Sequence, residues 1–545
     1  MTPVLEISNL AVDIAGRRIV DGVSLAIRKG ECVGVVGESG SGKSMTALAA
    51  IGLLPPAATV APGSAIRIGG ADILGMDHRA LRRVRGSRVG VIFQDPMSSL
   101  NPFMRVGAQI VEAIRAHRDI GRADARRMAL ELLGEVGIRE PERRIDAFPH
   151  ELSGGQQQRV MIAMALSTDP ELLIADEPTT ALDATVQHQI LTLLQRLRRQ
   201  RGMALMFISH DLGVVAAIAE RVAVMRDGRV VEAGPVGALL GCPEHPYTRS
   251  LIEARRRLVA SRSTHAARPG EAPCVAVEGL RIAYRAAFGL GRPFVAVEGL
   301  DLAIGPGRAL GLVGESGSGK SSVARALAGL VRPEAGRIAM LGRQFTPRHW
   351  TAPRPLRGKR QIVFQNPSGA LNPRLTVRRQ LDEPLDAIRA PSDATRTRRM
   401  VALLHDVGLD DSFLDRYPHE MSGGQKQRVC IARALLSDPE VLICDEVVSS
   451  LDVTTQLQVL RLLDGLRRAR GFAMLFIGHD LDAVAAISDE IAVMHEGRVV
   501  ERGTAREIVE APTTSHTRAL VEAMNAVRLP PAQPVAARRA AGPMA

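Results

Sequence analysis

The sequence has few cysteines and few aromatic residues. Its five cysteines are scattered without CxxC spacing, which argues against a disulfide framework, a zinc site or an iron–sulfur cluster and fits a reducing compartment. Aromatic residues make up only 3%, so aliphatic side chains must fill most of the core. The net charge is +12, but no dense Lys/Arg run with interleaved aromatics occurs, so the charge alone does not indicate nucleic-acid binding.

Long apolar runs are also missing. The most apolar stretch, 45–61, is interrupted by Thr46, Gly52, Pro55 and Pro56 and is too short to span a bilayer. The N-terminal residues MTPVLEISNLAVDI lack a basic flank followed by an apolar run, so we expect no signal peptide. If the protein works at a membrane, we expect it to do so through partners.

An internal repeat sets the organisation of the chain. The string VGESGSGKS begins at Val36 and again 277 residues later at Val313. SGGQ begins at Ser153 and again 269 residues later at Ser422. Motifs that recur in one order at nearly constant spacing predict a duplicated domain of about 250 residues.

The segments between and after the copies differ in composition. Residues 255–273 are rich in Arg, Ser, Ala and Pro without a sustained apolar period, and are typical of a linker. We therefore predict a first domain at 1–254, a linker at 255–273 and a second domain at 274–528. The tail at 529–545 is similarly biased and is predicted to be disordered.

Each copy alternates strand-like and helix-like segments. The apolar runs 32–36 and 309–313 each enter a glycine-rich turn and then a helix-forming segment. The runs 172–175 and 441–444 are fully apolar and end in carboxylates, as buried parallel strands do. In each copy, the segment between the glutamine of an FQ(D/N)P string and the SGGQ string has helical character. The pattern predicts two α/β cores, each with a helical insert.

Both copies contain the phosphate-binding pattern GxxxxGK[ST]. Glycines allow backbone N–H groups to approach the phosphates, and the following helix presents its positive end to them. The lysine reaches the β- and γ-phosphates, and the serine hydroxyl can bind Mg²⁺. The predicted ATP-binding loops are Gly37, Glu38, Ser39, Gly40, Ser41, Gly42, Lys43 and Ser44, and Gly314, Glu315, Ser316, Gly317, Ser318, Gly319, Lys320 and Ser321.

Acidic pairs complete the predicted hydrolytic sites. Asp176 and Asp445 end buried strands and are predicted to hold Mg²⁺. Glu177 and Glu446 follow them, where a carboxylate can orient and deprotonate the attacking water. Polar residues that follow other apolar runs are predicted to lie near the γ-phosphate, and the glutamines also near Mg²⁺: His210, His479, Gln94 and Gln365.

A further motif supports a resemblance to a known family. Leu152-Ser-Gly-Gly-Gln156 and Met421-Ser-Gly-Gly-Gln425 resemble the signature of ATP-binding cassette (ABC) proteins. Together with the phosphate loops, acidic pairs, glutamines and histidines, the resemblance covers nearly the whole chain. It implies two tandem P-loop ABC nucleotide-binding domains that use ATP and Mg²⁺. The signature residues are Ser153, Gly154, Gly155 and Gln156, and Ser422, Gly423, Gly424 and Gln425.

The resemblance also implies that the two halves share their nucleotides. Lys43 and Ser44 would pair with the signature at 422–425, and Lys320 and Ser321 with that at 153–156. Asp183 and Asp452 lie in segments that resemble the loop that crosses the contact between such domains.

The two predicted sites differ at the position where ABC domains usually stack an aromatic ring on adenine. Tyr284 occupies it in the second copy, and Ile14 in the first. Weaker adenine stacking is therefore expected in the first site, by about 1 kcal/mol. Both glutamates are present, so both sites are expected to hydrolyse ATP.

Within the family, the strings around Gln94 and Gln365 resemble the dipeptide/oligopeptide/nickel importer group. Cys242-Pro-Glu-His-Pro-Tyr-Thr-Arg-Ser-Leu251 resembles the HPYT segment of that group, and its second copy at 512–520 is degenerate. The resemblance implies a peripheral motor on the cytoplasmic face of the inner membrane. Its partners would be two permease subunits and, indirectly, an extracytoplasmic solute-binding protein, with no nucleic acid.

Two other functions are compatible with tandem ABC domains. A soluble ATPase acting on ribosomes or DNA fits the basic charge, but such proteins usually carry a long charged helical linker or zinc-binding cysteines. An exporter motor is disfavoured by the importer-like FQ(D/N)P…LNP strings. The cargo itself is not encoded here, because in such systems the permeases and the binding protein contact it.

Overall fold

The structure is a computed structural model, and it describes residues 2–95, 99–180, 182–261, 272–285, 293–350, 358–390, 393–449 and 451–530. Contacts divide the chain into two compact units. The first comprises 1–178, 194–256 and 527–545, and the second 179–193 and 257–526. The middle of the predicted linker and nearly all of the predicted disordered tail lie outside the described residues.

The first copy has two sheets. An antiparallel sheet has the order β2-β1-β5-β6 with β4 beside β1, and a mainly parallel sheet has the order β11-β10-β3-β9-β8-β7. The strands are β1 (Leu5–Ile14), β2 (Arg17–Ile27), β3 (Cys32–Val36), β4 (Ala58–Val60), β5 (Ala65–Ile68), β6 (Ala71–Asp72), β7 (Val89–Ile92), β8 (Leu172–Asp176), β9 (Ala204–Ser209), β10 (Arg221–Arg226) and β11 (Arg229–Pro235).

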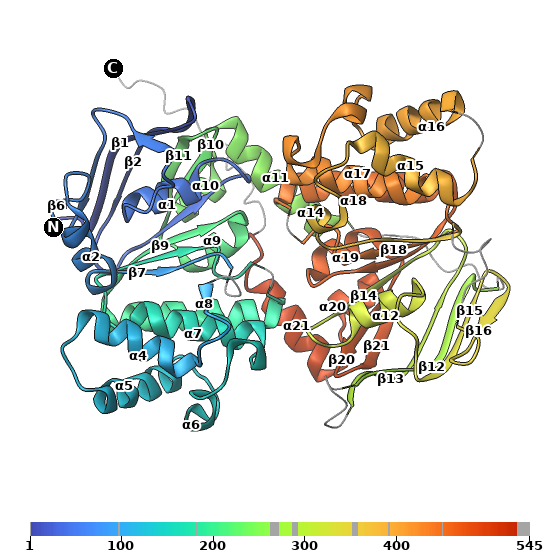
Figure 1. The fold of residues 1–545 in the computed structure, drawn as a ribbon, viewed down its shortest axis with the longest axis horizontal. Coiled ribbons are helices and arrows are strands. Elements are labelled where there is room, and N and C mark those ends of the chain that lie inside the picture. Colours follow the sequence, from blue (N-terminus) through green and yellow to red (C-terminus); the bar gives the residue numbers. More distant parts are fainter. Residues whose placement is uncertain are drawn as a thin grey trace, which may run out of the picture. The chain divides into compact units, whose positions relative to one another are not determined.

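Helices surround these sheets, and α1 packs in the core between them. The helices α4, α5 and α7 pack on one another, with α6 beside α5, and form the predicted helical insert (Figure 1). The helices are α1 (Lys43–Ala50), α2 (His78–Ser87), α4 (Val106–His117), α5 (Arg122–Glu135), α6 (Pro141–Arg144), α7 (Gly154–Leu166), α8 (Ala184–Arg201), α9 (Leu212–Ile218), α10 (Val236–Gly241) and α11 (Pro246–Ala260).

The second copy repeats this architecture. Its antiparallel sheet has the order β13-β12-β15-β16, and its mainly parallel sheet the order β17-β18-β19-β14-β20-β21. The strands are β12 (Val275–Tyr284), β13 (Phe294–Ile304), β14 (Ala309–Gly314), β15 (Ala335–Met340), β16 (Arg343–Phe345), β17 (Arg360–Val363), β18 (Val441–Asp445), β19 (Ala473–Ile477), β20 (Glu490–His495) and β21 (Arg498–Thr504).

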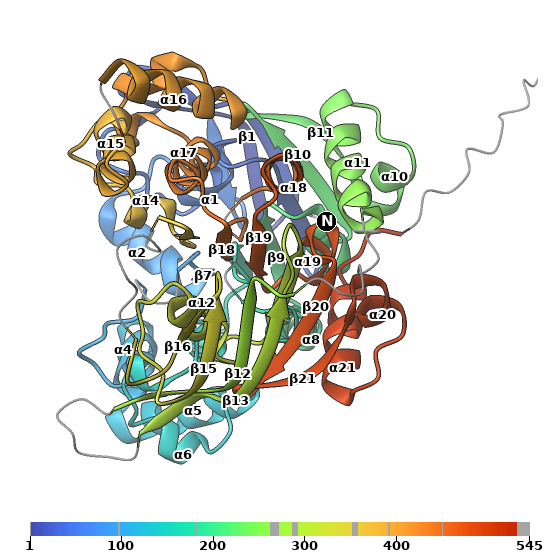
Figure 2. The same cartoon turned by 90° about the vertical axis from the view of Figure 1, so that its right-hand side faces the viewer.

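Its helices also follow the first copy, and α20 packs on β21 at one edge of the sheet (Figure 2). They are α12 (Lys320–Leu327), α14 (Pro367–Ala370), α15 (Val377–Ala387), α16 (Asp393–Asp406), α17 (Gly423–Leu435), α18 (Val453–Arg470), α19 (Leu481–Ile487), α20 (Ala505–Glu510) and α21 (Ser515–Asn525). Among the residues described, no helix combines the length and the apolar character needed to cross a bilayer.

Strand register explains why the predicted motifs meet. Parallel pairing aligns Ile92 with Ala175 and Asp176 with Ile208, and it aligns Val36 with Ser209. The carboxyl ends of β7, β8, β9 and β3 therefore lie along one edge of the sheet, where ligands of parallel sheets bind. The second copy has the same arrangement through β17, β18, β19 and β14.

One predicted boundary differs from the structure. Residues 255–260, assigned to the linker, continue the helix α11. The side chain of Leu258 is fully buried, and Arg255 is only 4% exposed. The arginine-rich composition concealed this helix because the apolar face is carried by few residues.

Candidate active sites

The first phosphate-binding loop begins directly after β3 and the second at Gly314, the last residue of β14. Both end in the first turns of α1 and α12. Gly42 and Gly319 precede these helices with φ of 94° and 101°, a left-handed conformation that favours glycine. A Cβ at Gly37 would lie 2.2 Å from the carbonyl oxygen of Met225. The glycines at these positions are therefore required by the backbone path itself.

The two loop lysines are buried and folded against their own loops. Lys43 Nζ donates to the carbonyl oxygens of Gly37 and Glu38, both at 2.8 Å. Lys320 Nζ makes the same bonds to Gly314 and Glu315, also at 2.8 Å. Burial lowers the pKa of Lys320 despite the carboxylates around it. Each ammonium is thus held at the place where a phosphate chain would enter the loop.

The acidic pairs meet the loop serines. Ser321 Oγ donates to Asp445 Oδ1 at 3.1 Å, and a hydrogen bond with Ser44 acts on Asp176 in the first copy. Burial raises the pKa of both aspartates. The buried Oδ1 of Asp176 has no hydrogen-bond partner among the described residues. A hydroxyl beside a carboxylate with an unsatisfied oxygen is a donor set that suits Mg²⁺.

Each glutamate is joined to both of the polar residues predicted beside it. Gln94 Nε2 donates to Glu177 Oε2 at 2.9 Å, and His210 Nδ1 lies 3.3 Å from Glu177 Oε1. In the second copy, Gln365 Nε2 donates to Glu446 at 2.7 Å and His479 Nδ1 lies 3.4 Å from it. The structure therefore brings each predicted Gln–Glu–His set together.

The glutamates are held in an unusual backbone conformation. Glu177 has φ of 48° and Glu446 has φ of 50°, values uncommon for residues other than glycine. Their backbone N–H groups donate to Ile208 and Ile477 on the neighbouring strands, at 3.0 Å in both copies. Backbone strain of this kind persists at functional sites where the surrounding structure imposes it.

Contact between each histidine and its glutamate also shifts the pKa values of these residues. Burial lowers the pKa of His210 and His479, but the hydrogen bond and charge of the neighbouring glutamate outweigh it, so both pKa values are raised. For Glu446, burial raises the pKa, but the bond with His479 outweighs it and the net shift is downward. A carboxylate that stays ionised can accept a proton from water.

In the second unit these groups line one pocket of about 280 Å³. Loop residues Ser316, Lys320 and Ser321 lie on its wall together with Gln365, Glu446 and His479. It therefore combines a phosphate cradle with a metal-type donor set and a base, the parts that phosphoryl transfer to water requires.

Comparison with known proteins identifies this arrangement. The sequence profile of the ABC transporter family matches residues 20–180 and 297–449, and that of the oligopeptide/dipeptide transporter C-terminal region matches 231–280. The chain belongs to the ABC transporter family. It is an ABC-type ATPase whose ATP hydrolysis is coupled to transport.

Similar proteins match both halves of this ABC protein. It is 45% identical to the peptidoglycan transport ATP-binding protein YejF of Agrobacterium fabrum, over 96% of each chain. It is 43% identical to the glutathione import ATP-binding protein GsiA of Pectobacterium atrosepticum, over 96% of this chain and 89% of that one. It is 40% identical to the oligopeptide transport ATP-binding protein OppD of Mycobacterium bovis, over 96% and 98%.

Among solved structures, it is similar to a dimeric post-hydrolysis ATP-binding cassette bound to ADP and Pi. The identity is 29% and the TM-score 0.39, over 43% of this chain and 98% of that one.

The ABC signatures cap helices, as the sequence indicates. Ser153 and Ser422 are the N-cap residues of α7 and α17, and each forms a reciprocal capping box with the glutamine three residues later. Both serines are exposed. The pocket in the second unit has none of the residues 422–425 on its wall. An anion-binding helix end thus remains available to a nucleotide held elsewhere.

The structure offers Phe294, besides Tyr284, as a candidate for the aromatic residue that stacks on adenine. Tyr284 Oη donates to Ser322 Oγ at 3.1 Å, and its ring packs against the core. Phe294, paired with Tyr284 across the two strands, is 64% exposed and lines the pocket. Sequence reasoning missed Phe294, although its rarity as an aromatic residue was a usable signal. At the paired positions the first copy has Ile14 and Arg17.

The HPYT segment reaches the ATP site, which sequence reasoning also missed. Tyr247, in the first turn of α11, accepts a hydrogen bond at its hydroxyl from the backbone N–H of Glu38, at 3.0 Å. Glu232 on β11 accepts bonds from the backbone N–H groups of Glu244 and His245, which fixes the start of α11. The phosphate loop and the C-terminal helix of this half are therefore in direct contact.

Proposed function

We propose that the chain is the motor of an importer for peptides or peptide-like solutes. The observation that carries this proposal is the HPYT segment: it matches the oligopeptide/dipeptide transporter profile, and its Tyr247 bonds to the phosphate loop. The relatives named for glutathione import and oligopeptide transport support the same solute class.

In the proposed mechanism each ATP lies between the loop of one half and the signature of the other. Lys43 and Ser44 hold the phosphates with Ser422 to Gln425, and Lys320 and Ser321 with Ser153 to Gln156. Because each signature places an exposed serine and glycine at a helix N-terminus, the positive end of that helix can stabilise the negative charge on the γ-phosphate. Binding of two ATP molecules then closes the halves, and hydrolysis releases them.

The residues that would hold Mg²⁺ are Ser44, Asp176 and Gln94 in the first half, and Ser321, Asp445 and Gln365 in the second. When bound, the ion neutralises charge on the β- and γ-phosphates. Glu177 and Glu446 orient water and accept its proton. Gln94 and His210 hold the two carboxylate oxygens of Glu177, whereas Gln365 and His479 both contact Oε2 of Glu446.

The proposed partners are two permease subunits that bind this chain on the cytoplasmic face of the inner membrane. An extracytoplasmic binding protein would deliver the cargo, and membrane contact would be indirect. Reconstitution in proteoliposomes tests this proposal. The permeases are inserted in the vesicle membrane with this chain bound on the outer side, and a peptide-loaded binding protein is enclosed in the lumen, which corresponds to the outside of the cell.

We expect peptide-stimulated ATP hydrolysis and peptide movement only when all three components are present. The Glu177→Gln/Glu446→Gln chain is the matched control, because it preserves assembly and removes the bases. Stimulation by ribosomes or DNA, with no response to permeases, would contradict the importer assignment and favour the soluble ABC alternative.

A further inference from the structure

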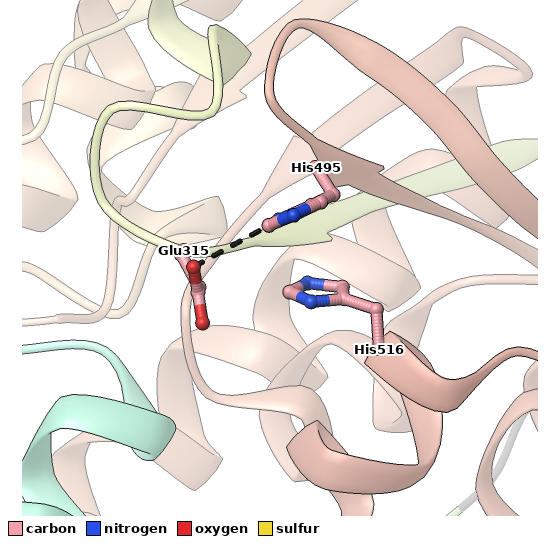
Figure 3. A group of neighbouring side chains, drawn as sticks. All are labelled: Glu315, His495 and His516. Carbon is pink, nitrogen blue, oxygen red and sulfur yellow. Dashed lines mark ion pairs between the residues drawn. The ribbon is translucent and has the colours of Figure 1, made fainter.

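The second unit contains a cluster of one glutamate and two histidines, side chains of the types that bind metal ions. The proposed ATPase mechanism gives neither histidine a role. Glu315 directly follows β14, His495 is the last residue of β20, and His516 lies in the first turn of α21 (Figure 3). One donor atom from each residue lies within 4.8 Å of the other two. His495 Nδ1 is 3.9 Å from Glu315 Oε2, and the two imidazole rings have centroids 4.0 Å apart.

One nitrogen atom of the cluster lacks a hydrogen-bond partner among the described residues. This atom is Nε2 of His516, and it is buried. Buried polar atoms are nearly always paired, so such an atom indicates a water or an ion that completes the site. Burial, and then the charge of His495, lower the pKa of His516.

In the first copy, the same three positions of the fold carry no histidine. The equivalent positions of the repeat are Glu38, Arg226 and Tyr247. The Arg226 guanidinium carbon lies 4.9 Å from the Tyr247 ring centroid, and the Tyr247 hydroxyl accepts from Glu38 N–H. A cation–π contact and a hydrogen bond thus join loop, strand and helix there. Both side chains are replaced by histidine in the second copy, opposite a retained glutamate.

We propose that Glu315, His495 and His516 form a binding site for a divalent transition metal ion of the Zn²⁺, Ni²⁺ or Co²⁺ type. Two imidazoles and one carboxylate suit these ions, whereas Mg²⁺ and Ca²⁺ prefer oxygen donors alone. At bond lengths of about 2.0–2.2 Å, tetrahedral ligands are about 3.3–3.6 Å apart. The three donor atoms, which lie within 4.8 Å of one another, would move closer to reach that spacing.

The proposed site would couple metal to nucleotide. Glu315 belongs to the phosphate loop, and its carbonyl oxygen accepts a hydrogen bond from Lys320. A metal ion bound by Glu315 therefore ties the loop to α21 and β20. It would take the structural place of the Tyr247 bond in the first half. Both ATP sites would still use Mg²⁺, but only the second would respond to a transition metal ion.

Binding of Co²⁺ and Zn²⁺ to the purified full chain tests the proposal without ATP or permeases. We expect one Co²⁺ per chain with a visible d–d spectrum, displaced by Zn²⁺, and a rise in Tm with Zn²⁺. The variant His495→Arg/His516→Tyr installs the side chains of the first copy. It should fold with the Tm of the metal-free wild type, weaken Co²⁺ binding at least tenfold and remove the Zn²⁺ response.

Two control variants make the test selective. His405→Gln changes an exposed histidine outside the cluster and should leave Co²⁺ stoichiometry and spectrum unchanged. Arg226→His/Tyr247→His should add a second Co²⁺ per chain. Equal Co²⁺ binding by the wild type and His495→Arg/His516→Tyr would overturn the proposal, as would an unchanged stoichiometry in Arg226→His/Tyr247→His. Neither result bears on the importer assignment, since neither measurement involves ATP hydrolysis or transport.

Discussion

Tyr284 was predicted to stack on adenine, and the structure offers Phe294 as a second candidate for that role. The Tyr284 hydroxyl is bonded to Ser322 beside the phosphate loop, whereas the Phe294 ring is exposed at the pocket. A ring that is exposed on the wall of the pocket can stack on a base with little rearrangement. The first copy offers Arg17 at this position, which supports the predicted difference between the two sites.

We expect Phe294→Ala to lower ATP affinity of the second site about fivefold, because loss of one stacking contact costs about 1 kcal/mol. The measurement is a nucleotide titration in a Lys43→Ala background, where the second site dominates binding. Arg17→Ala in a Lys320→Ala background is the matched control, with a smaller expected change. If Tyr284 alone stacks on adenine, Phe294→Ala would leave the affinity unchanged and Tyr284→Ala would carry the loss.

We proposed that Glu177 and Glu446 are the bases that act on water, and on that proposal their amide counterparts should bind ATP and fail to hydrolyse it. We expect Glu177→Gln/Glu446→Gln to lower turnover by about 10²–10³-fold. ATP retained after gel filtration should rise, because hydrolysis no longer releases the closed state. Rates of phosphate release and retained ATP measure both effects. Undiminished hydrolysis would remove the role assigned to both glutamates.

At the scale of single elements, the helices α11 and α21 are anchored by partly buried carboxylates. Glu501 on β21 accepts from the backbone N–H groups of Thr513 and Thr514 at 2.8 and 3.0 Å, just before α21. Burial alone raises the pKa of Glu501, but bonds from Thr517, Thr513 and Thr514 lower it to about 2. The degenerate copy of the HPYT segment therefore keeps its anchor although its sequence has diverged.

We expect Glu501→Gln to destabilise the second unit by about 1–3 kcal/mol, as for loss of a charged acceptor of several donors. Since the folded pKa is depressed, this contribution is complete above about pH 4.5, the unperturbed value, and is lost as the pH falls towards 2. The stability difference between wild type and Glu501→Gln, from urea unfolding at pH 7 and pH 3.5, should therefore shrink at the lower pH. Glu522→Gln, on the exposed side of α21, is the control and should show no difference at either pH.

How far the sequence predicts these elements depends on the signal each one carries. The strands β3, β8 and β9 were predictable because buried parallel strands are continuous apolar runs that end in motif residues. The continuation of α11 to Ala260 was not, because Leu258 is the one buried apolar residue in a stretch rich in arginine. The bond between Tyr247 and Glu38 joins residues far apart in the chain, and no local pattern encodes such a contact.

For the whole molecule, the sharing of each nucleotide by the two halves is the proposal on which the mechanism depends. It can be tested by pairing substitutions in a Glu177→Gln/Glu446→Gln background, where trapped ATP can be counted. If Lys43 works with the signature at Ser422, then Lys43→Ala and Ser422→Arg damage the same site. That double variant should still trap one ATP per chain, as each single variant does.

The crossed pair gives the opposite result under the same proposal. Lys43→Ala and Ser153→Arg lie in the same half, but they would damage different shared sites, so no ATP should remain trapped. Interactions within one site are non-additive, whereas losses from separate sites combine. If each half instead built a site alone, Lys43→Ala/Ser153→Arg would retain one ATP and Lys43→Ala/Ser422→Arg none. The two double variants therefore distinguish a motor that closes around its nucleotides from two independent ATPases on one chain.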